Sequence, residues 1–293
     1  MTKTHNEITE HLFRFTEPSK LYIRVLLTEL CNSKCVFCFK ECSKGNDDKL
    51  FGMEFFRVLV RVAEKHAIPK IHFTGGEPLL INEVADYIGQ VTKRSTVDVG
   101  LTTNGTLLHN HAGRLYAAGL RRINVSLPSL RSARYQAICG QDMLKTVLSN
   151  IDIAIDTGFW PVKINIPVYG ENADEMLEFM EYFLPKDGAI LRFFSILPND
   201  GIPARSCLTF EETTTYLDEA IDQIEGNRSK EMCEKKPRSE SITAHLFCRV
   251  RQSVQPVRKG TTVRIRRRPS GFRETVTFAC AWQIQPTQLK LSA

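Results

Sequence analysis

Short β-rich apolar runs alternate with longer helical stretches between residue 21 and about residue 197. In the first helical stretch the residues Val58, Leu59, Val62, Ala63 and His66 fall at helical spacing and can face a core. The predicted strands are Leu21–Thr28, Lys70–Thr74, Val97–Thr102, Arg122–Leu127, Val162–Val168 and Ile190–Ile196. The predicted helices are Met53–His66, Asn82–Lys93, Leu107–Ala118, Leu144–Thr157 and Ala173–Phe183. Strands that alternate with helices imply parallel pairing through crossovers.

Six such strand–helix units predict an α/β fold, either an open barrel or a doubly wound sheet, and the pattern alone does not separate the two. In both architectures the active site lies at the carboxyl ends of the strands. Polar and glycine-rich pieces follow the first four predicted strands, at Thr28–Phe39, Gly75–Pro78, Thr102–Gly105 and Ser126–Ser129. We therefore expect one wall of a cavity to be built from four separate parts of the chain.

The last third of the chain follows another pattern. It is expected to contain a helix at Phe210–Ile224, a polar loop or linker at Glu225–Ser241, and a hairpin that pairs Thr262–Arg266 with Glu274–Phe278 about Pro269–Gly271. We divide the chain into a main domain over residues 18–200 and a C-terminal region over residues 201–293 that caps the substrate.

The amino-acid composition indicates to which broad class of protein the chain belongs. The 293 residues are 42% hydrophobic and include nine cysteines, with neither the apolar run of a signal peptide nor a stretch that could span a bilayer. We expect a soluble cytoplasmic protein without a membrane partner, in which clustered thiols bind metal. Eight arginines and Lys259 give the segment Arg249–Arg273 a charge of +9, which leaves −3 of the total +6 for the rest. Such a segment suits phosphate, an anionic substrate or nucleic acid, and a solvated basic face is as plausible.

Three thiols lie within eight residues, at Cys31, Cys35 and Cys38, just after the first predicted strand. A loop this short can wrap three sulfurs around one inorganic centre. Three ligands leave a fourth position open. Zinc would then hold a bound water or take Cys42 as its fourth ligand, whereas a cubane cluster would have one iron without a protein ligand.

The C-x3-C-x2-C spacing, followed by Gly75-Gly-Glu-Pro78 after the next strand, resembles the radical S-adenosylmethionine (SAM) superfamily. The resemblance implies a partial (β/α)6 barrel, and a [4Fe–4S] cluster on the three cysteines whose open iron binds SAM. One electron from the cluster then breaks a C–S bond of SAM, and the 5′-deoxyadenosyl radical abstracts a substrate hydrogen. Gly75 and Gly76 would let backbone approach the methionine amino group, Glu77 would accept from that group or hold the turn, Pro78 would stiffen the turn's exit, and Phe37 would pack beside the cofactor.

A finer resemblance covers about residues 18 to 197. The segments Leu101–Gly105, Ile123–Leu127, Val162–Asn165 and Leu191–Phe193 are similar to the GTP cyclase family of molybdenum cofactor biosynthesis. The resemblance assigns Ser126 and Leu197 to the cofactor pocket, and Arg24, Thr103 and Lys163 to the nucleotide substrate. We add to the substrate residues His72, which stands where the family has Arg or Lys, and Arg266 and Arg268, which lie in a segment that resembles the family's arginine run. Without the family context, Arg24 could be a strand-end ion pair, Lys163 an exposed strand residue and Ser126 a turn hydroxyl.

The chain departs from the cyclase pattern at several points. Pro128 stands where that family has Asp, and Leu197 where it has Met. Two of the three cysteines that hold the family's second, C-terminal cluster are missing, because Thr261 and Arg264 occupy their positions and only Cys280 remains near the third. Cys233, Cys248 and Cys280 are too dispersed in sequence to define a site. We therefore expect one cluster.

The resulting hypothesis is a biosynthetic radical SAM enzyme, a lyase or oxidoreductase by net reaction, that abstracts hydrogen from a small anionic substrate such as a nucleoside, nucleotide or sugar acid. An electron donor such as flavodoxin or ferredoxin would be its partner. One alternative is the GTP 3′,8-cyclase itself. Another is an RNA-binding or RNA-modifying protein that uses the basic segment, although we expect no nucleic-acid partner because no RNA-binding motif accompanies the arginines.

Overall fold

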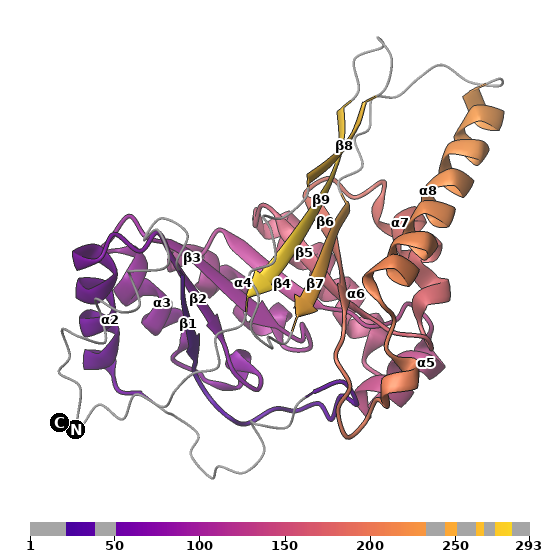
Figure 1. Cartoon of the computed structure of the whole chain (residues 1–293). Coiled ribbons are helices and arrows are strands. Elements are labelled where there is room, and N and C mark those ends of the chain that lie inside the picture. The colour runs from indigo at the N-terminus through magenta and orange to yellow at the C-terminus, as the bar shows by residue number, and fades with distance from the viewer. Residues whose placement is uncertain (1–21, 39–50, 233–243, 251–261, 267–272, 283–293) are drawn as a thin grey trace, which may run out of the picture. The chain divides into compact units, whose positions relative to one another are not determined.

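The computed structural model describes residues 22–38, 51–232, 244–250, 262–266 and 273–282, with side chains as far as residue 226 (Figure 1). The chain divides into two compact units. Unit 1 comprises residues 1–35, 39–126 and 135–163, and unit 2 comprises residues 36–38, 127–134 and 164–293. Among the described residues, no helix is both long enough and apolar enough to cross a membrane.

The strands follow the order β1-β2-β3-β4-β5-β6-β7-β9-β8 along the sheet. The first six are β1 (Ile23–Leu26), β2 (Lys70–Thr74), β3 (Asp98–Thr103), β4 (Arg122–Ser126), β5 (Val162–Val168) and β6 (Ala189–Ser195). These six therefore run in sequence order, and β1 does not pair with β6, so the sheet is open.

Unit 1 contains β1 to β4 and their crossover helices. The helices are α2 (Met53–Lys65), α3 (Val84–Thr92), α4 (Leu108–Ala117), α5 (Ser132–Cys139) and α6 (Leu144–Thr157), with a short 3-10 turn, η2 (Pro78–Leu80). The pairs β1–β2, β2–β3 and β3–β4 are parallel. Every crossover thus returns the chain to the same end of the sheet, and the loops after the strands gather there.

One face of this sheet is apolar and lies under helices. Side chains of β2 to β4 on that face are buried, as Phe73, Leu101 and Val125 illustrate. Phe56 of α2 contacts the ring of Phe73 with centroids 6.0 Å apart and stacks on Tyr87 of α3 at 4.4 Å. Because side chains alternate along a strand, the residues between these apolar ones point to the opposite face. That opposite face carries the polar side chains of β1 to β4.

Unit 2 packs its own helices onto the remaining strands. They are η3 (Ala173–Glu175), α7 (Met176–Phe183), η4 (Ala204–Ser206) and α8 (Phe210–Met232). Phe179 of α7 meets Phe193 of β6 edge-on at 6.4 Å, and the hydroxyls of Ser195 and Thr213 hydrogen-bond at 3.0 Å. The sheet then continues through β7 (Ala244–Val250), which pairs parallel with β6, and through β9 (Arg273–Trp282) and β8 (Thr262–Arg266), which pair antiparallel.

Most predicted elements agree with the structure, but one predicted loop and two predicted core residues were wrong, and two elements were not predicted. The strands at residues 70–74 and 162–168 and the helix at 144–157 have the predicted bounds, and the antiparallel hairpin is confirmed, although its turn lies outside the described residues. The predicted loop at Glu225–Ser241 begins too early, because α8 continues to Met232. Helix α5 and strand β7 were not predicted. Val58 and Val62 are 39% and 41% exposed and do not face the core, whereas Leu59 and Ala63 do.

Candidate functional site

The glycine turn after β2 lies directly on the chain that leads from β1 to the cysteine loop. Gly76 N donates to Thr28 O at 2.8 Å, and Glu77 N donates to Leu30 O at 2.7 Å. A Cβ on Gly75 would lie 2.6 Å from Thr28 O, and one on Gly76 would lie 2.0 Å from Leu30 O. Both obstacles are backbone atoms, so this approach requires glycine at both positions.

Glu77 holds the turn from inside. Its carboxylate is fully buried and accepts from Leu79 N at 3.0 Å, from Thr103 Oγ1 at 2.6 Å and from Asn104 N at 2.7 Å. Burial raises the pKa of Glu77 from its ordinary 4.5 to about 6, against the opposing effect of these three donors. The next residue, Pro78, is buried and begins η2. The carboxylate therefore ties the turn after β2 to the loop after β3.

Asn104 continues this connection to the cysteine loop. Its Nδ2 donates to Asn32 Oδ1 at 2.7 Å and to Ser33 Oγ at 3.3 Å, and lies 4.0 Å from Cys31 Sγ. Asn32 in turn donates to Thr106 Oγ1 at 2.9 Å. The loops after β1, β2 and β3 are thus joined by one continuous set of hydrogen bonds.

Helix α5 holds the other side of the cysteine loop. Lys34 N donates to Cys139 O at 2.9 Å, at the end of α5. The neighbouring side chain of Cys139, together with burial, raises the pKa of the Cys35 thiol. Cys31 is exposed, whereas Cys35 is partly buried.

The segment Val36–Cys38 belongs to unit 2, where the turn after β6 holds it. Asn199 Nδ2 donates to Phe37 O at 3.1 Å. A Cβ on Gly201 would lie 2.2 Å from Val36 O, so this turn also approaches the backbone too closely for a side chain. Leu197, two residues before Asn199, is half-buried, and Cys38 is exposed. Phe37 and Leu197 are therefore carried by two short segments that contact each other.

A row of basic side chains crosses the polar face of unit 1. The pairing register aligns Arg24 of β1 with His72 of β2, His72 with Gly100 of β3, and Gly100 with Arg122 of β4. A Cβ at Gly100 would lie 2.6 Å from His72 Nδ1, so the glycine makes room for the imidazole ring. One residue further along β3, Thr102 Oγ1 hydrogen-bonds to His72 Nε2 at 2.7 Å.

The remaining predicted site residues lie in different surroundings. Ser126 ends β4 and is half-buried, as is Lys163 in β5. Thr103 points to the apolar side of the sheet, is 2% exposed and donates to Glu77. The side chain of Arg266 and the whole of Arg268 lie outside the described residues. The roles assigned to these residues stay predictions.

Sequence reasoning missed three side chains that the structure places here. Thr102 and Asn124, which hydrogen-bond at 3.2 Å, share the polar face with His72. Strand alternation counted from His72 would have found them. Cys139 had no comparable signal, because a single cysteine in a helix is most often a small apolar core residue.

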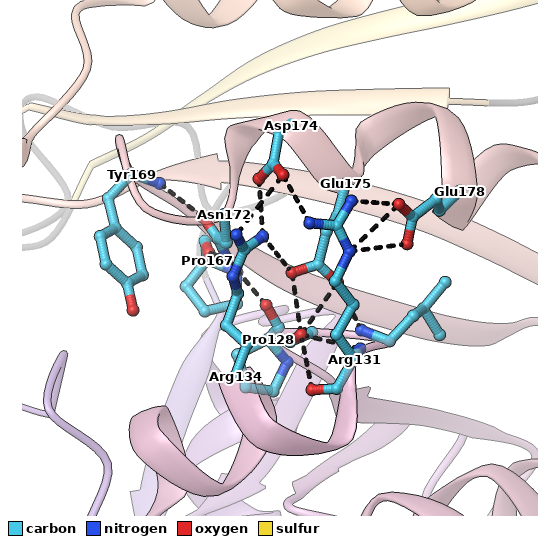
Figure 2. A network of polar contacts seen from close by, with 11 residues as sticks. Pro128, Arg131, Arg134, Pro167, Tyr169, Asn172, Asp174, Glu175 and Glu178 are labelled. Atoms are coloured by element: carbon cyan, nitrogen blue, oxygen red, sulfur yellow. Dashed lines mark hydrogen bonds and ion pairs between the residues drawn. The ribbon is translucent and has the colours of Figure 1, made fainter.

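Unit 2 buries a second carboxylate near the end of β4. Glu175 is fully buried and accepts from Ser129 Oγ at 2.8 Å, from Leu130 N at 2.7 Å and from Arg134 at 2.6 Å (Figure 2). Asn172 Nδ2 donates to the carbonyl oxygen of Pro128 at 2.8 Å. This network fixes the loop after β4 to the turn after β5.

The C-terminal cysteines are only partly placed. Cys248 of β7 and Cys280 of β9 are Cα partners in the register of the two parallel strands, whereas Cys233 lies outside the described residues. The backbone therefore brings together two cysteines that are 32 positions apart in sequence.

The family model for the radical SAM superfamily matches residues 25–183, more than half of the chain. The chain belongs to the radical SAM superfamily. Members of this superfamily hold a [4Fe–4S] cluster and use SAM, so these are the cofactors of the chain. The matched residues begin within β1 and include the three cysteines and the glycine turn.

Curated relatives carry the name of one branch of this superfamily. A probable GTP 3′,8-cyclase of Methanocaldococcus jannaschii is 34% identical over 176 residues, which cover 60% of this chain and 59% of the relative. A GTP 3′,8-cyclase of Staphylococcus saprophyticus is also 34% identical, over 68% of this chain and 62% of the relative. The chain spans about three fifths of the length of these relatives. This is the similarity to GTP cyclases that the sequence resemblance predicted.

Solved structures confirm the fold. SuiB of Streptococcus suis bound to SAM superposes with a TM-score of 0.59 at 16% identity, over 70% of this chain and 48% of SuiB. The enzyme anSMEcpe with bound SAM gives 0.56 at 21% identity, over 69% and 59% of the two chains. The open, parallel six-stranded arrangement is thus the partial (β/α)6 barrel of these enzymes, and a doubly wound sheet is excluded.

The residues present fit the cofactors of the family. Three thiols on one short loop are the donor set that an iron–sulfur cluster needs, and Gly75 and Gly76 expose backbone beside that loop. In the described part of the chain, no three side chains of His, Cys, Asp or Glu already stand in a metal-binding geometry. The fit of these residues to a cluster and SAM therefore rests on the thiol chemistry of the three cysteines and on the close approach of the glycine turn to the chain that leads into the cysteine loop.

Proposed function

We propose that this protein cleaves SAM reductively at a [4Fe–4S] cluster held by Cys31, Cys35 and Cys38, and abstracts hydrogen from a small anionic substrate. The observation that carries the first half is the joining of the cysteine loop to the glycine turn through Gly76 N–Thr28 O and Glu77 N–Leu30 O. The cluster and SAM, when bound, supply the electron and the hydrogen-abstracting group. The protein holds both in place and keeps water from them.

Each residue near the loop has a role in this proposal. The glycine turn offers backbone carbonyl oxygens to the SAM amino group, with Glu77 fixing the turn from behind rather than facing the cofactor. The family resemblance assigns Phe37, Ser126 and Leu197 to SAM binding. Asn104 holds the loop that carries Cys31.

The basic row supports an anionic substrate. Arg24 and His72 lie in register on the polar face of the sheet, in line with Arg122, whose guanidinium is ion-paired with Asp98. Guanidinium groups match phosphate and carboxylate oxygens. Lys163 of β5 adds a further cation to the proposed set. We expect these residues to bind the acidic part of the substrate while the cofactors act on another part of it.

Anaerobic reconstitution tests the cluster. We expect about four irons per chain and formation of 5′-deoxyadenosine from SAM under dithionite, from the cubane stoichiometry. Alanine at Cys31, Cys35 or Cys38 should abolish both, whereas Cys207→Ala, which changes a cysteine outside the loop, should preserve both. Wild-type protein that binds iron but leaves SAM intact under strong reductant would contradict the proposal.

GTP and guanosine form a matched pair for the substrate, because they share base and sugar and differ in charge. We expect GTP to bind more tightly, to weaken as salt rises, and to lose affinity in Arg24→Ala. Arg57→Ala, which alters an exposed arginine on α2 paired with Glu54, is the control. Guanosine binding as tightly as GTP and equally unaffected by salt would contradict an anionic substrate.

GTP 3′,8-cyclase is the second candidate function, and the names of the curated relatives favour it. A cyclase of that family would need a second cluster, held by cysteines other than those of the family pattern. Cys248 and Cys280, which are partners in the strand register, are two candidates for its ligands. About eight irons per chain and consumption of GTP would support the cyclase, whereas about four irons and unchanged GTP would support a redirected enzyme.

A further inference from the structure

One serine of the cysteine loop is held from two sides. Ser33 lies between Cys31 and Cys35, and its Oγ accepts from Gln141 Nε2 at 3.1 Å and from Asn104 Nδ2 at 3.3 Å. Asn104 comes from the loop after β3, whereas Gln141 lies two residues beyond the end of α5. The fold therefore brings two amides from distant parts of the chain to a single hydroxyl.

The backbone next to Ser33 is fixed as well. Lys34 N donates to Cys139 O, at the end of α5, at 2.9 Å. Gly140 follows with φ +79°, and a Cβ there would lie 3.2 Å from Lys34 Cβ, so the chain after α5 packs closely against the loop. Together with the two bonds to Ser33 Oγ, this contact restricts rotation of the loop between the first two cysteines.

This arrangement directs a backbone donor at a sulfur. Ser33 N donates to Cys31 Sγ at 3.4 Å, and Asn104 Nδ2 lies 4.0 Å from the same sulfur. Because the hydroxyl and the N–H of Ser33 are joined through one Cα, holding the hydroxyl limits where the N–H can point. Hydrogen bonds to the sulfur ligands of an iron–sulfur cluster help to set its reduction potential, since they stabilise the negative charge that reduction adds.

We propose that Gln141 and Asn104 are positioning residues, which hold Ser33 so that its backbone N–H bonds the sulfur of Cys31 in the iron-free chain and stays on that sulfur in the cluster, where it raises the reduction potential. The inference rests on the proposed function in that it takes Cys31 as a cluster ligand. It goes further by giving a role to Ser33 and Gln141, two residues outside the predicted site.

Two substitutions release Ser33. Ser33→Ala removes the acceptor, and Gln141→Ala removes one of the two donors. EPR-monitored redox titration of the reconstituted, SAM-free protein measures the midpoint potential. We expect the one-electron reduction equilibrium to fall about threefold in Ser33→Ala, or about 30 mV, for weakening of one hydrogen bond, and by a smaller factor in Gln141→Ala. Ser33→Thr, which keeps the hydroxyl, should stay close to wild type. Gln136→Ala, at an exposed glutamine of α5, is the matched control and should not shift.

Hydrogen–deuterium exchange of the iron-free chain gives a second readout that needs no cluster. The peptide over residues 31–35 should exchange about fivefold faster in Ser33→Ala than in wild type, because the N–H of Ser33 is no longer held on the sulfur of Cys31. Gln141→Ala should change the rate in the same direction, and Gln136→Ala should exchange as wild type does.

The outcomes separate this inference from the proposed function. The same potential in wild type, Ser33→Ala and Gln141→Ala, each with its cluster assembled, would overturn the inference and leave the cluster in place. A wild-type chain that assembles no cluster would overturn the proposed function, and the inference with it. If either variant alone fails to assemble a cluster, exchange of the iron-free chain decides: an unchanged rate refutes the inference, and a faster rate supports it.

Discussion

Replacing Gly76 by alanine tests how tightly the glycine turn is built. The new Cβ would lie 2.0 Å from Leu30 O, whereas ordinary contacts begin at 3.4 Å, so the two chains must separate by about 1.4 Å. That movement would break the bonds Gly76 N–Thr28 O and Glu77 N–Leu30 O, which are 2.8 and 2.7 Å long. Two lost backbone hydrogen bonds at about 1 kcal/mol each, with about 1–3 kcal/mol of overpacking strain, predict a loss of about 3–5 kcal/mol in stability.

Gly113→Ala is the matched control. Gly113 lies within α4, and a Cβ there would meet nothing within 4 Å, so alanine should stabilise the helix by about 0.5–1 kcal/mol. Urea denaturation measures both free energies of unfolding, and equilibrium dialysis with reconstituted protein measures SAM binding. A Gly76→Ala variant that unfolds at the same urea concentration as wild type and still binds SAM would refute the close approach of the glycine turn to Leu30.

Three further variants follow from the same contacts. The raised pKa of Glu77 means that its ionisation opposes folding, so the free energy of unfolding should fall by about 2 kcal/mol as pH rises from about 4.5 to about 6. Urea denaturation at a series of pH values measures this fall, which Glu77→Gln should remove. The same pH dependence in the variant would contradict the prediction. Glu175→Ala should lower the free energy of unfolding by about 3–5 kcal/mol because it leaves donors without their acceptor, whereas Glu178→Ala, at an exposed carboxylate, should lower it by about 0–1 kcal/mol. Equal losses in the two variants would refute the role of the Glu175 network. Gly201→Ala should lower reconstituted iron content while Gly226→Ala, which meets nothing within 4 Å, does not; equal iron in both would show that the turn after β6 does not hold the cysteine segment.

The sequence predicted the main fold because its signals are local. Apolar alternation located β2 and β5 to the residue, and the helical period located α6. Helix α5 was missed because the apolar spacing of its eight residues is weak and because Pro128 and Ser129 before it read as a turn. The tail of α8 was missed because its residues after Ile224 are polar, although helical backbone bonds need no apolar side chains.

The site was predictable as far as motifs reach. The cysteines and the glycine turn are recognised by spacing, yet spacing does not tell which way a side chain points. Thr103 and Thr102 are neighbours of the same type, and only the strand register shows that the first faces Glu77 and the second faces His72. Cys139 lies 104 positions after Cys35, so its place beside the cysteine loop, where its backbone oxygen accepts from Lys34 N, follows from the packing of α5 and from no local pattern.

The hydrogen bonds that run from Glu77 through Asn104 to Asn32 have a consequence for how such enzymes diversify. Because each of the three loops after β1, β2 and β3 supplies a partner to another, exchanging one of them for a relative's loop would leave donors in the other loops without their partners. We therefore expect the three loops to be kept together as one unit when related sequences diverge. New substrates would be acquired by changing the strand faces and the C-terminal region around that module. A chimera that transplants all three loops together should fold where single-loop transplants fail.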